Sequence, residues 1–355
     1  MNRMFLAAAL IGLAAVSCSR DVTTSRQCHE EMPSVYYWKT VLDQDPQEYS
    51  FIRTHGIGRI YLRMFDVVAD SHAMTDDERT VPNASVRIDT PTYRFMKDSM
   101  ADLEFVPVVF ITLDALRAMQ GKESVLAANI VGRVKNMVSY NSLPNVRELQ
   151  LDCDWTPSTE KSFFALCDSV KGSIGRHQLP WRLSSTIRLH QLARRVPPVD
   201  NGVLMVYNTG SFSDPDAANS IIDIKDVAPY MRYLSSYRLH LDVAYPTYSW
   251  QLLFRKRQFV GLLNGLNLAD TTRFTCKKEH LFMVRRDLPH NGIILREGDM
   301  IRQERSEFAD IARVRAMIEE RLAGRPHSNI LYHLDSNNLV KYSSYEIDHI
   351  LSTVR

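Results

Sequence analysis

The eight residues from Glu148 to Trp155 limit the possible folds of this chain more than any other stretch. Their sequence, ELQLDCDW, alternates polar and apolar side chains, which is the period of a β-strand with two different faces. A helix is expected to follow almost at once, from Ser158 to about Ser173, because its apolar residues recur at helical spacing. A strand that runs directly into a helix indicates a parallel βα unit.

Asp152 and Asp154 lie on the polar face of this strand. In a closed barrel of βα units, one face of each strand packs on the surrounding helices and the other faces the barrel interior. Both carboxylates are therefore expected inside, near the C-terminal mouth. Because burying an unpaired carboxylate is costly, we expect these groups to be paired, hydrated or functional.

Strand-like and helix-like segments alternate along the rest of the chain. The predicted strands are residues 35–38, 59–65, 105–112, 148–155, 181–189, 203–208, 239–245 and 329–335, and further helices are predicted at 45–54, 124–138, 306–322 and 343–354. Eight such units predict a (β/α)₈ TIM-like barrel, with a β-hairpin insertion at about 254–305 before the last βα unit. An open doubly wound sheet, or a small second domain in this segment, is the alternative.

The N-terminus has the pattern of an export signal. The apolar run from Phe5 to Val16 follows Arg3 and is too short to span a bilayer. It ends in Ala15-Val16-Ser17-Cys18, which resembles the lipobox of bacterial lipoproteins, where the cysteine becomes the lipidated first residue. We therefore expect a signal peptide at 1–17, a lipid anchor at Cys18, a tether at 18–32 and the barrel at 33–355. Ordinary signal cleavage nearby is the alternative.

The residue after the cysteine, Ser19 rather than Asp, predicts an outer-membrane location for the anchored protein. The chain has 43 Lys and Arg residues against 41 Asp and Glu residues, so its charge gives no reason to expect a nucleic-acid partner. Cys153 and Cys167 fall on apolar faces and are predicted to be core residues.

Several kinds of chemistry find no support in the sequence. It contains no Gly-x-Ser-x-Gly elbow, no phosphate-binding Gly-Lys-Ser/Thr loop and no dinucleotide fingerprint, so no cofactor is predicted. No metal site is predicted either, because no two of the candidate histidines lie at a ligand spacing on one element. The candidate ligands are His190, His240 and His333 with Asp335.

The predicted strand faces bring polar and aromatic residues together. The interior is expected to receive Arg63, Asp152, Asp154, Thr186, Arg188, His240, Asp242, His333 and Asp335, and the C-terminal mouth Trp38, Trp155, Tyr207, Asn208 and Tyr245. Active sites of such barrels lie at this mouth. Aromatic rings beside carboxylates suit sugars, because the C–H faces stack on the rings while the hydroxyl groups bond to the carboxylates. We therefore predict a carbohydrate cleft.

Two motifs resemble those of family 18 glycoside hydrolases. Leu151-Asp152-Cys153-Asp154-Trp155 is similar to the later part of the family's fourth-strand motif, in which alternate aspartates precede an aromatic residue and the catalytic Glu. Met205-Val206-Tyr207-Asn208 resembles the sixth-strand Met-x-Tyr-Asp. The run from Tyr36 to about Tyr248 is more closely similar to a group of uncharacterised bacterial barrel proteins, in which a Gln-x-Asp-x-Asp strand precedes a Ser-x-Thr strand.

The departures from the family pattern bear on activity. Thr156 stands at the position of the acid Glu, and Leu149 replaces the leading Asp of the motif. The resemblance implies substrate-assisted hydrolysis in which that Glu protonates the leaving oxygen, and a threonine hydroxyl is too weak an acid for this step. Hydrolysis of the family type is therefore disfavoured. Thr156 is instead expected to cap the following helix.

Two hypotheses follow from the same residues. The first is a lipid-anchored envelope protein that binds a polysaccharide or oligosaccharide and hydrolyses it, with Asp154 and Asp242 as the leading carboxylates and Asp152 as a third candidate. The predicted contact surface is Trp38, Arg63, Trp155, Arg188, Tyr207, Asn208 and Tyr245. The second is a non-catalytic glycan-binding or scaffold lipoprotein, in which Asp152 pairs with Arg63 or Arg188, and Asp242 joins an interior ion-pair network with His240.

Overall fold

The computed structural model describes residues 30–43, 45–75 and 79–353. The predicted signal peptide, Cys18 and most of the predicted tether lie outside these residues. Eight parallel strands form a closed sheet, since β1 pairs with both β18 and β3 and every other neighbouring pair is also parallel. These strands are β1 (Ser34–Tyr37), β3 (Arg59–Ala69), β6 (Glu104–Ile111), β7 (Glu148–Asp152), β8 (Arg182–Arg188), β9 (Asn201–Met205), β10 (Leu241–Pro246) and β18 (Asn329–Tyr332). The predicted (β/α)₈ barrel is confirmed.

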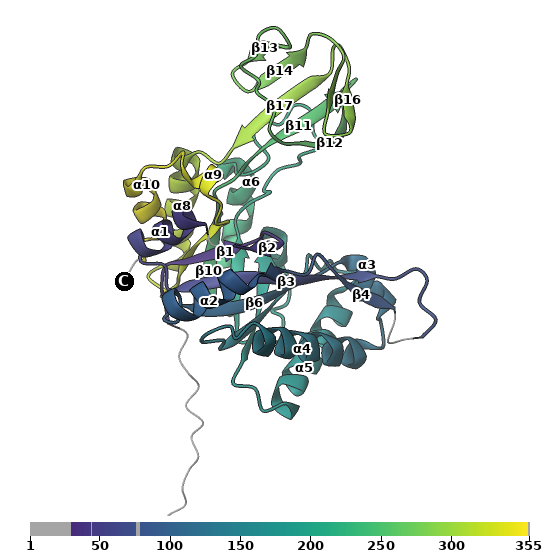
Figure 1. Cartoon of the computed structure of the whole chain (residues 1–355), viewed down its shortest axis with the longest axis vertical. Coiled ribbons are helices and arrows are strands. Elements are labelled where there is room, and N and C mark those ends of the chain that lie inside the picture. Colours follow the sequence, from purple (N-terminus) through teal and green to yellow (C-terminus); the bar gives the residue numbers. More distant parts are fainter. Residues whose placement is uncertain (1–29, 44, 76–78, 354–355) are drawn as a thin grey trace, which may run out of the picture. The chain divides into compact units, whose positions relative to one another are not determined.

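The helices that cover the barrel differ widely in length. The longer ones are α1 (Pro46–Thr54), α2 (Thr90–Ser99), α4 (Glu123–Tyr140), α5 (Glu160–Arg176), α8 (Phe308–Leu322) and α10 (Ser344–Leu351), and α4 and α5 lie side by side (Figure 1). Short helical turns take the other positions: α3 (Leu113–Ala118), α6 (Ile224–Val227), α7 (Met231–Leu234), α9 (Ser336–Leu339), and the 3₁₀ turns η2 (Leu189–Ala193) and η3 (Ala228–Tyr230). The barrel is therefore irregular between β8 and β10.

Two apolar clusters occupy the two faces of the barrel strands. Leu149 and Leu151 of β7 belong to the large cluster between strands and helices. Gln150, between them, faces the interior, where its Oε1 accepts a hydrogen bond of 2.6 Å from the Tyr36 hydroxyl of β1. Because β1 and β7 are not neighbours in the sheet, this bond crosses the barrel. The alternation predicted for this strand is therefore confirmed.

Helix starts follow local capping chemistry. Asp45 accepts backbone N–H bonds at the N-terminus of α1, and Ser343 with Glu346 forms a capping box on α10. The predicted N-cap residue of α5, Thr156, was wrong by three residues. The helix has its N-cap position at Thr159 and not at Thr156, whose backbone N–H donates to Thr159 Oγ1 at 2.9 Å. The chain therefore makes one extra turn between strand and helix.

The insertion before α8 is larger than the predicted hairpin. Its strands form a five-stranded antiparallel sheet in the order β12-β11-β17-β14-β13, with a separate β15–β16 hairpin (Figure 1). They are β11 (Ser249–Arg255), β12 (Gln258–Leu263), β13 (Phe274–Lys278), β14 (Leu281–Val284), β15 (Leu288–His290), β16 (Ile293–Leu295) and β17 (Met300–Arg305). The turn between β11 and β12 consists of Lys256 and Arg257, both at positive φ. Since such turns usually carry Asn or Gly, the sequence lacked the expected hairpin signal.

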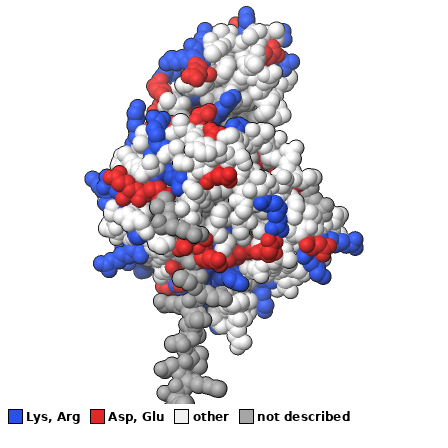
Figure 2. Space-filling model, turned by 90° about the vertical axis from the view of Figure 1, so that its left-hand side faces the viewer, with Lys and Arg blue, Asp and Glu red and all other residues white. Residues whose placement is uncertain are grey.

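Short strands also occur in the segment between β3 and α2. β4 (Thr80–Asn83) pairs with the end of β3, and β5 (Arg87–Ile88) pairs with β2 (Val41–Leu42). Figure 2 shows acidic and basic side chains interspersed over the visible face of the molecule. Within the described residues, no helix combines the length and the apolar character needed to cross a bilayer.

Candidate functional site

A cavity of about 350 Å³ opens where the barrel strands end at their carboxyl termini. Seven of the ten predicted catalytic and substrate-binding residues line it: Trp38, Arg63, Asp152, Asp154, Arg188, Tyr207 and Asn208. They come from β1, β3, β7, β8 and β9 or from the residues that follow these strands. The closed barrel brings together segments that are far apart in the sequence, as expected for the mouth of this fold.

The carboxylate of Asp152, the last residue of β7, accepts hydrogen bonds from two side chains of β8. Its Oδ1 accepts hydrogen bonds from Thr186 Oγ1 at 2.6 Å and from Arg188 Nη2 at 3.1 Å. Only 2% of the Asp152 residue is exposed. Burial acts to lower the pKa of Arg188, but Asp152, Tyr207 and Asp154 together outweigh it and raise that pKa above its ordinary value. The predicted structural alternative for Asp152, a pair with Arg188, is therefore present.

Arg63 and Asp66 lie on the same side of β3 because this strand contains a β-bulge. The register of β3 against β6 shifts between Arg63 and Phe65. In a regular strand, residues 63 and 66 would point to opposite faces, but the extra residue places them on the same side. Arg63 can thus donate from Nε to Asp66 Oδ1 at 2.9 Å while its guanidinium lies 5.3 Å from the centre of the Trp38 ring. The Asp66 pair fixes Arg63 against the aromatic wall.

Aromatic rings form one wall of the cavity. Tyr207 stacks on Tyr332 with a centroid distance of 4.2 Å, and Tyr332 lies 5.6 Å from Trp38. Burial raises the pKa of both tyrosines, so their hydroxyls are neutral donors at physiological pH. The side chain of Arg188 lies over the Tyr207 ring at 5.7 Å. These rings form a rigid apolar surface with polar edges.

Tyr332 was missed by the sequence prediction, which placed His333 and Asp335 on the interior face. Ile330 and Leu331 show the true alternation, since Ile330 lies in the interior cluster and Leu331 in the outer one. The even-numbered Tyr332 therefore faces the cavity. The polar character of His333 and Asp335 had suggested the opposite alternation, but both residues lie beyond the end of β18.

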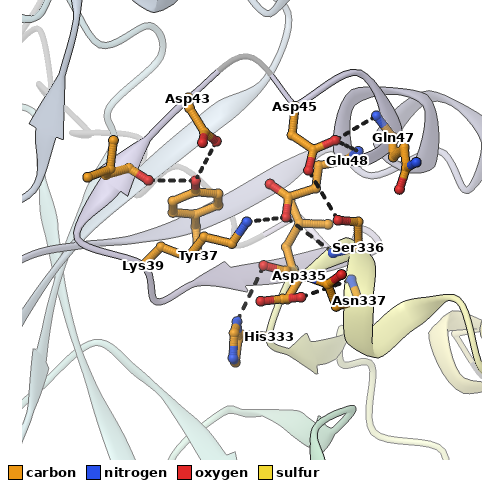
Figure 3. Close-up of polar contacts among 12 residues, drawn as sticks. Tyr37, Lys39, Asp43, Asp45, Gln47, Glu48, His333, Asp335, Ser336 and Asn337 are labelled. Carbon is orange, nitrogen blue, oxygen red and sulfur yellow. Dashed lines mark hydrogen bonds and ion pairs between the residues drawn. The ribbon is translucent and has the colours of Figure 1, made fainter. Parts of the chain in front are cut away.

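His333 and Asp335 belong instead to a polar cluster beside the end of β1 (Figure 3). Asp335 caps α9, and the neighbouring Ser336 donates from its hydroxyl to Asp45 Oδ2 at 3.1 Å. In the same cluster Lys39 Nζ donates to Glu48 Oε1 at 2.5 Å. These contacts join the start of α1 to α9 and so hold the ends of β1 and β18 together.

Asp154 and His190 are polar residues of the cavity whose side chains are exposed and lie close to each other. Asp154 Oδ1 lies 3.5 Å from His190 Nε2, and 57% and 43% of the two side chains are exposed. Asp154 follows β7, and His190 lies in η2 directly after β8. Asp154 was predicted at the mouth, whereas His190 was considered only as a metal ligand. The described residues contain no group of three or more His, Cys, Asp or Glu side chains suited to a metal ion.

Three predicted site residues lie elsewhere. Asp242 is fully buried on β10, where it accepts a hydrogen bond of 2.7 Å from Ser328 N–H and lies 3.4 Å from His240 Nε2. It sits near the N-terminal end of its strand, and the contact with His240 that the alternative predicted is present. Trp155 and Tyr245 are fully buried in the outer cluster. Trp155 packs there on Phe163 and Phe164.

The burial of Trp155 and Tyr245 has a simple geometric cause. Both have odd numbers, like Leu149, Leu151 and Val243, which also belong to the outer cluster. The period of two therefore directs them toward the helices. Their aromatic character and their position near the strand ends had suggested the mouth, but the alternation continues to the end of each strand.

Among solved structures, those with a similar fold include two spore cortex-lytic enzymes named SleL. The Bacillus cereus enzyme is 10% identical with a TM-score of 0.50, and the match covers 90% of this chain and 75% of that one. The Bacillus megaterium enzyme is 14% identical with a TM-score of 0.51, covering 92% and 75%. The chitinase ChiA74 from Bacillus thuringiensis is 9% identical with a TM-score of 0.50, covering 86% and 66%.

No protein-family model and no curated protein matches the chain. At identities this low, likeness to solved structures establishes the fold alone. The chain therefore has a TIM barrel like those of the SleL enzymes and of chitinase ChiA74.

Proposed function

We propose that this protein binds an oligosaccharide or a polysaccharide chain in the cavity at the C-terminal mouth of its barrel. The observation that carries the proposal is the pairing of a stacked aromatic wall, Tyr207, Tyr332 and Trp38, with the exposed polar residues Asp154 and His190 in one cavity. Sugar C–H faces pack on such rings, and sugar hydroxyls bond to carboxylate and imidazole groups.

The size and rigidity of the cavity also suit a sugar ligand. Its volume of about 350 Å³ is that of a small-molecule site. Arg63 and Arg188 are each held by a carboxylate, Asp66 and Asp152, so the polar edge of the site is ordered before a ligand enters. Such preorganisation lowers the entropic cost of binding.

Hydrolysis by the carboxylate pair Asp154 and Asp242 is not part of this proposal. Asp242 is buried near the opposite end of its strand. Thr156, at the position of the family's acid, has a hydroxyl 2.9 Å from that of Ser158. Asp152 accepts two hydrogen bonds inside the barrel. Among the described residues that line the cavity, Asp154 therefore has neither the family's glutamic acid nor Asp242 as a catalytic partner.

The binding proposal is tested by retention of the purified protein on a panel of immobilised polysaccharides and chitooligosaccharides. Trp38→Ala and Tyr332→Ala should each weaken retention about tenfold, because the loss of an aromatic contact costs roughly 1 kcal/mol or more. Tyr140→Ala is the matched control, since 86% of this tyrosine is exposed on α4 outside the cavity. Retention on no glycan, or equal retention of all variants, would contradict the proposal.

We further propose that a lipid on Cys18 tethers the domain to the cell envelope, with the outer membrane as its location. The support is the sequence Ala15-Val16-Ser17-Cys18-Ser19 after a short apolar run. In cells fed radiolabelled palmitate, the wild type should carry the label in the membrane fraction, and Cys18→Ala should lose it. Unlabelled wild-type protein would rule out the anchor.

A further inference from the structure

We propose that Asp154 and His190 form an acid–base pair that gives the glycan-binding cavity a glycoside hydrolase activity in place of the missing glutamic acid. This inference rests on the proposed glycan binding and goes beyond it. His190 would be the residue that transfers the proton, and Asp154 would orient it. Neither the sequence motifs nor the resemblance to family 18 assigns a role to this histidine.

The first support is the geometry of the pair. β7 and β8 are hydrogen-bonded neighbours, so the segments that follow them emerge side by side at the mouth. Asp154 Oδ1 and His190 Nε2 lie 3.5 Å apart, and both residues line the cavity. Contacts between catalytic groups are often this long before a substrate binds and shorten into hydrogen bonds in the complex.

The second support is the contrast with the other carboxylates around the cavity. Asp152 accepts bonds from Thr186 and Arg188, and Asp66 accepts bonds from Arg63. Asp154, with more than half of its side chain exposed, has only His190 as an ion-pair partner among the described residues. An exposed pair of this kind contributes about 1 kcal/mol or less to folding. The fold therefore gains little from it, while a ligand can reach both groups.

Titratable and charged groups from several elements line the cavity beside His190. Asp154 and Asp152 lie on the β7 side, Arg188 lies on β8, and the other titratable groups of the lining are Arg63, Tyr207, Tyr230 and Tyr332. Burial keeps the hydroxyls of Tyr207 and Tyr332 neutral.

The proposed reaction uses one water molecule and no cofactor. Asp154 accepts the Nε2–H of His190, which leaves Nδ1 to carry the transferable proton. As the bond between C1 of the sugar and the glycosidic oxygen breaks, the Nδ1 proton passes to that oxygen, and the leaving sugar departs with a neutral hydroxyl. Water then attacks C1 from the vacated side and returns a proton to Nδ1. Two hydroxyl groups replace one glycosidic bond, and His190 is restored.

The test measures the release of reducing ends from each glycan that the wild-type protein retains, chitopentaose included, together with hydrolysis of the matching 2,4-dinitrophenyl glycoside. His190→Gln should lower release from the natural glycan about 10²- to 10⁴-fold, the usual contribution of a general acid. It should change the rate on the dinitrophenyl glycoside much less, because that leaving group needs no proton. His177→Gln, at an exposed histidine beyond the end of α5, is the matched control and should behave as wild type.

A pH profile separates proton transfer from a structural role. Wild-type release should fall at alkaline pH because the leaving oxygen must receive a proton, and this alkaline decline should disappear in His190→Gln. Asp154→Asn should reduce release as well. If the wild type is retained by a glycan but releases nothing from it, or if His190→Gln releases reducing ends as fast as wild type, the acid–base pair is overturned while glycan binding stands. If no glycan is retained, both proposals fall.

Discussion

Asp242 and Asp154 are both aspartates beside a histidine, yet 0% of the first side chain and 57% of the second are exposed. Asp242 lies near the start of β10, 3.4 Å from His240, and Asp154 follows the end of β7, 3.5 Å from His190. The distances are nearly equal. What differs is the position along the barrel axis, and this position decides whether such a pair serves stability or a ligand.

At the N-terminal end of the barrel, charged side chains are buried and paired with one another. Arg59 Nε donates to Glu104 Oε1 at 3.0 Å, and the Glu148 carboxylate lies within 3.5 Å of Arg182 Nη2. Asp242 adds a bond from the Ser328 N–H. Burial alone would lower the pKa of Arg59, but the surrounding groups Tyr61, Glu104, Glu148 and Asp242 raise it above its ordinary value. Mutual pairing thus offsets the desolvation of these groups, and each depends on its neighbours.

The largest effect is expected from Asp242→Ala. This change removes the carboxylate that lies beside His240 and whose charge offsets that of Arg59. The free energy of unfolding should therefore fall by about 3–5 kcal/mol, as for a broken buried ion pair. Urea unfolding followed by circular dichroism measures the loss. Glycan retention by the folded fraction at low temperature should be unchanged. If Asp242→Ala is as stable as the wild type but no longer binds glycan, Asp242 contacts the ligand and is not a structural residue.

The same contrast explains which features could be predicted from the sequence. A period of two tells which face of the sheet a side chain takes, so Gln150 and Asp152 were correctly placed inside and Leu149 and Leu151 outside. It does not tell how deep a residue lies along the barrel. Asp242 was therefore assigned to the right face but to the wrong end.

Other features depended on signals that the local sequence does not carry. The β-bulge that places Asp66 on the same side as Arg63 arises from the pairing of β3 with β6, which is a tertiary property. Lys256 and Arg257 close a tight turn with residues that usually avoid positive φ, which hid the sheet of the insertion. His190 follows β8 by two residues, and the pairing of β8 with β7 places it beside Asp154.

A smaller effect is expected from His327→Gln, which tests whether the N-terminal end responds to pH. His327 is 1% exposed. Burial acts to lower its pKa, but a hydrogen bond to Glu319 and the charges of Glu319 and Asp242 raise it above the ordinary value. The stabilisation is thus complete below the ordinary histidine pKa of about 6.5 and is lost as the pH rises through the raised value.

Urea unfolding of wild type and His327→Gln at pH 5.5 and 8.5 provides the measurement. The wild type should be more stable than the variant by about 1.5 kcal/mol at the lower pH, the size of a hydrogen bond to a charged group, and the difference should shrink at the higher pH. His177→Gln should keep the wild-type pH dependence. A difference that grows with pH would show that His327 is buried in its neutral form.

The smallest effect on stability is expected from Asp154→Asn, which tests the open end of the barrel. The side chain is more than half exposed, and its ion pair with His190 is screened by water, so the free energy of unfolding should change by no more than about 0.5 kcal/mol. Retention on the bound glycan should nevertheless weaken, because a carboxylate that accepts hydrogen bonds from sugar hydroxyls becomes an amide. Measured together, the two quantities separate a ligand contact from a structural pair. A loss of several kcal/mol in stability would mean that Asp154 supports the fold much as Asp242 does, and the two ends of the barrel would then no longer differ.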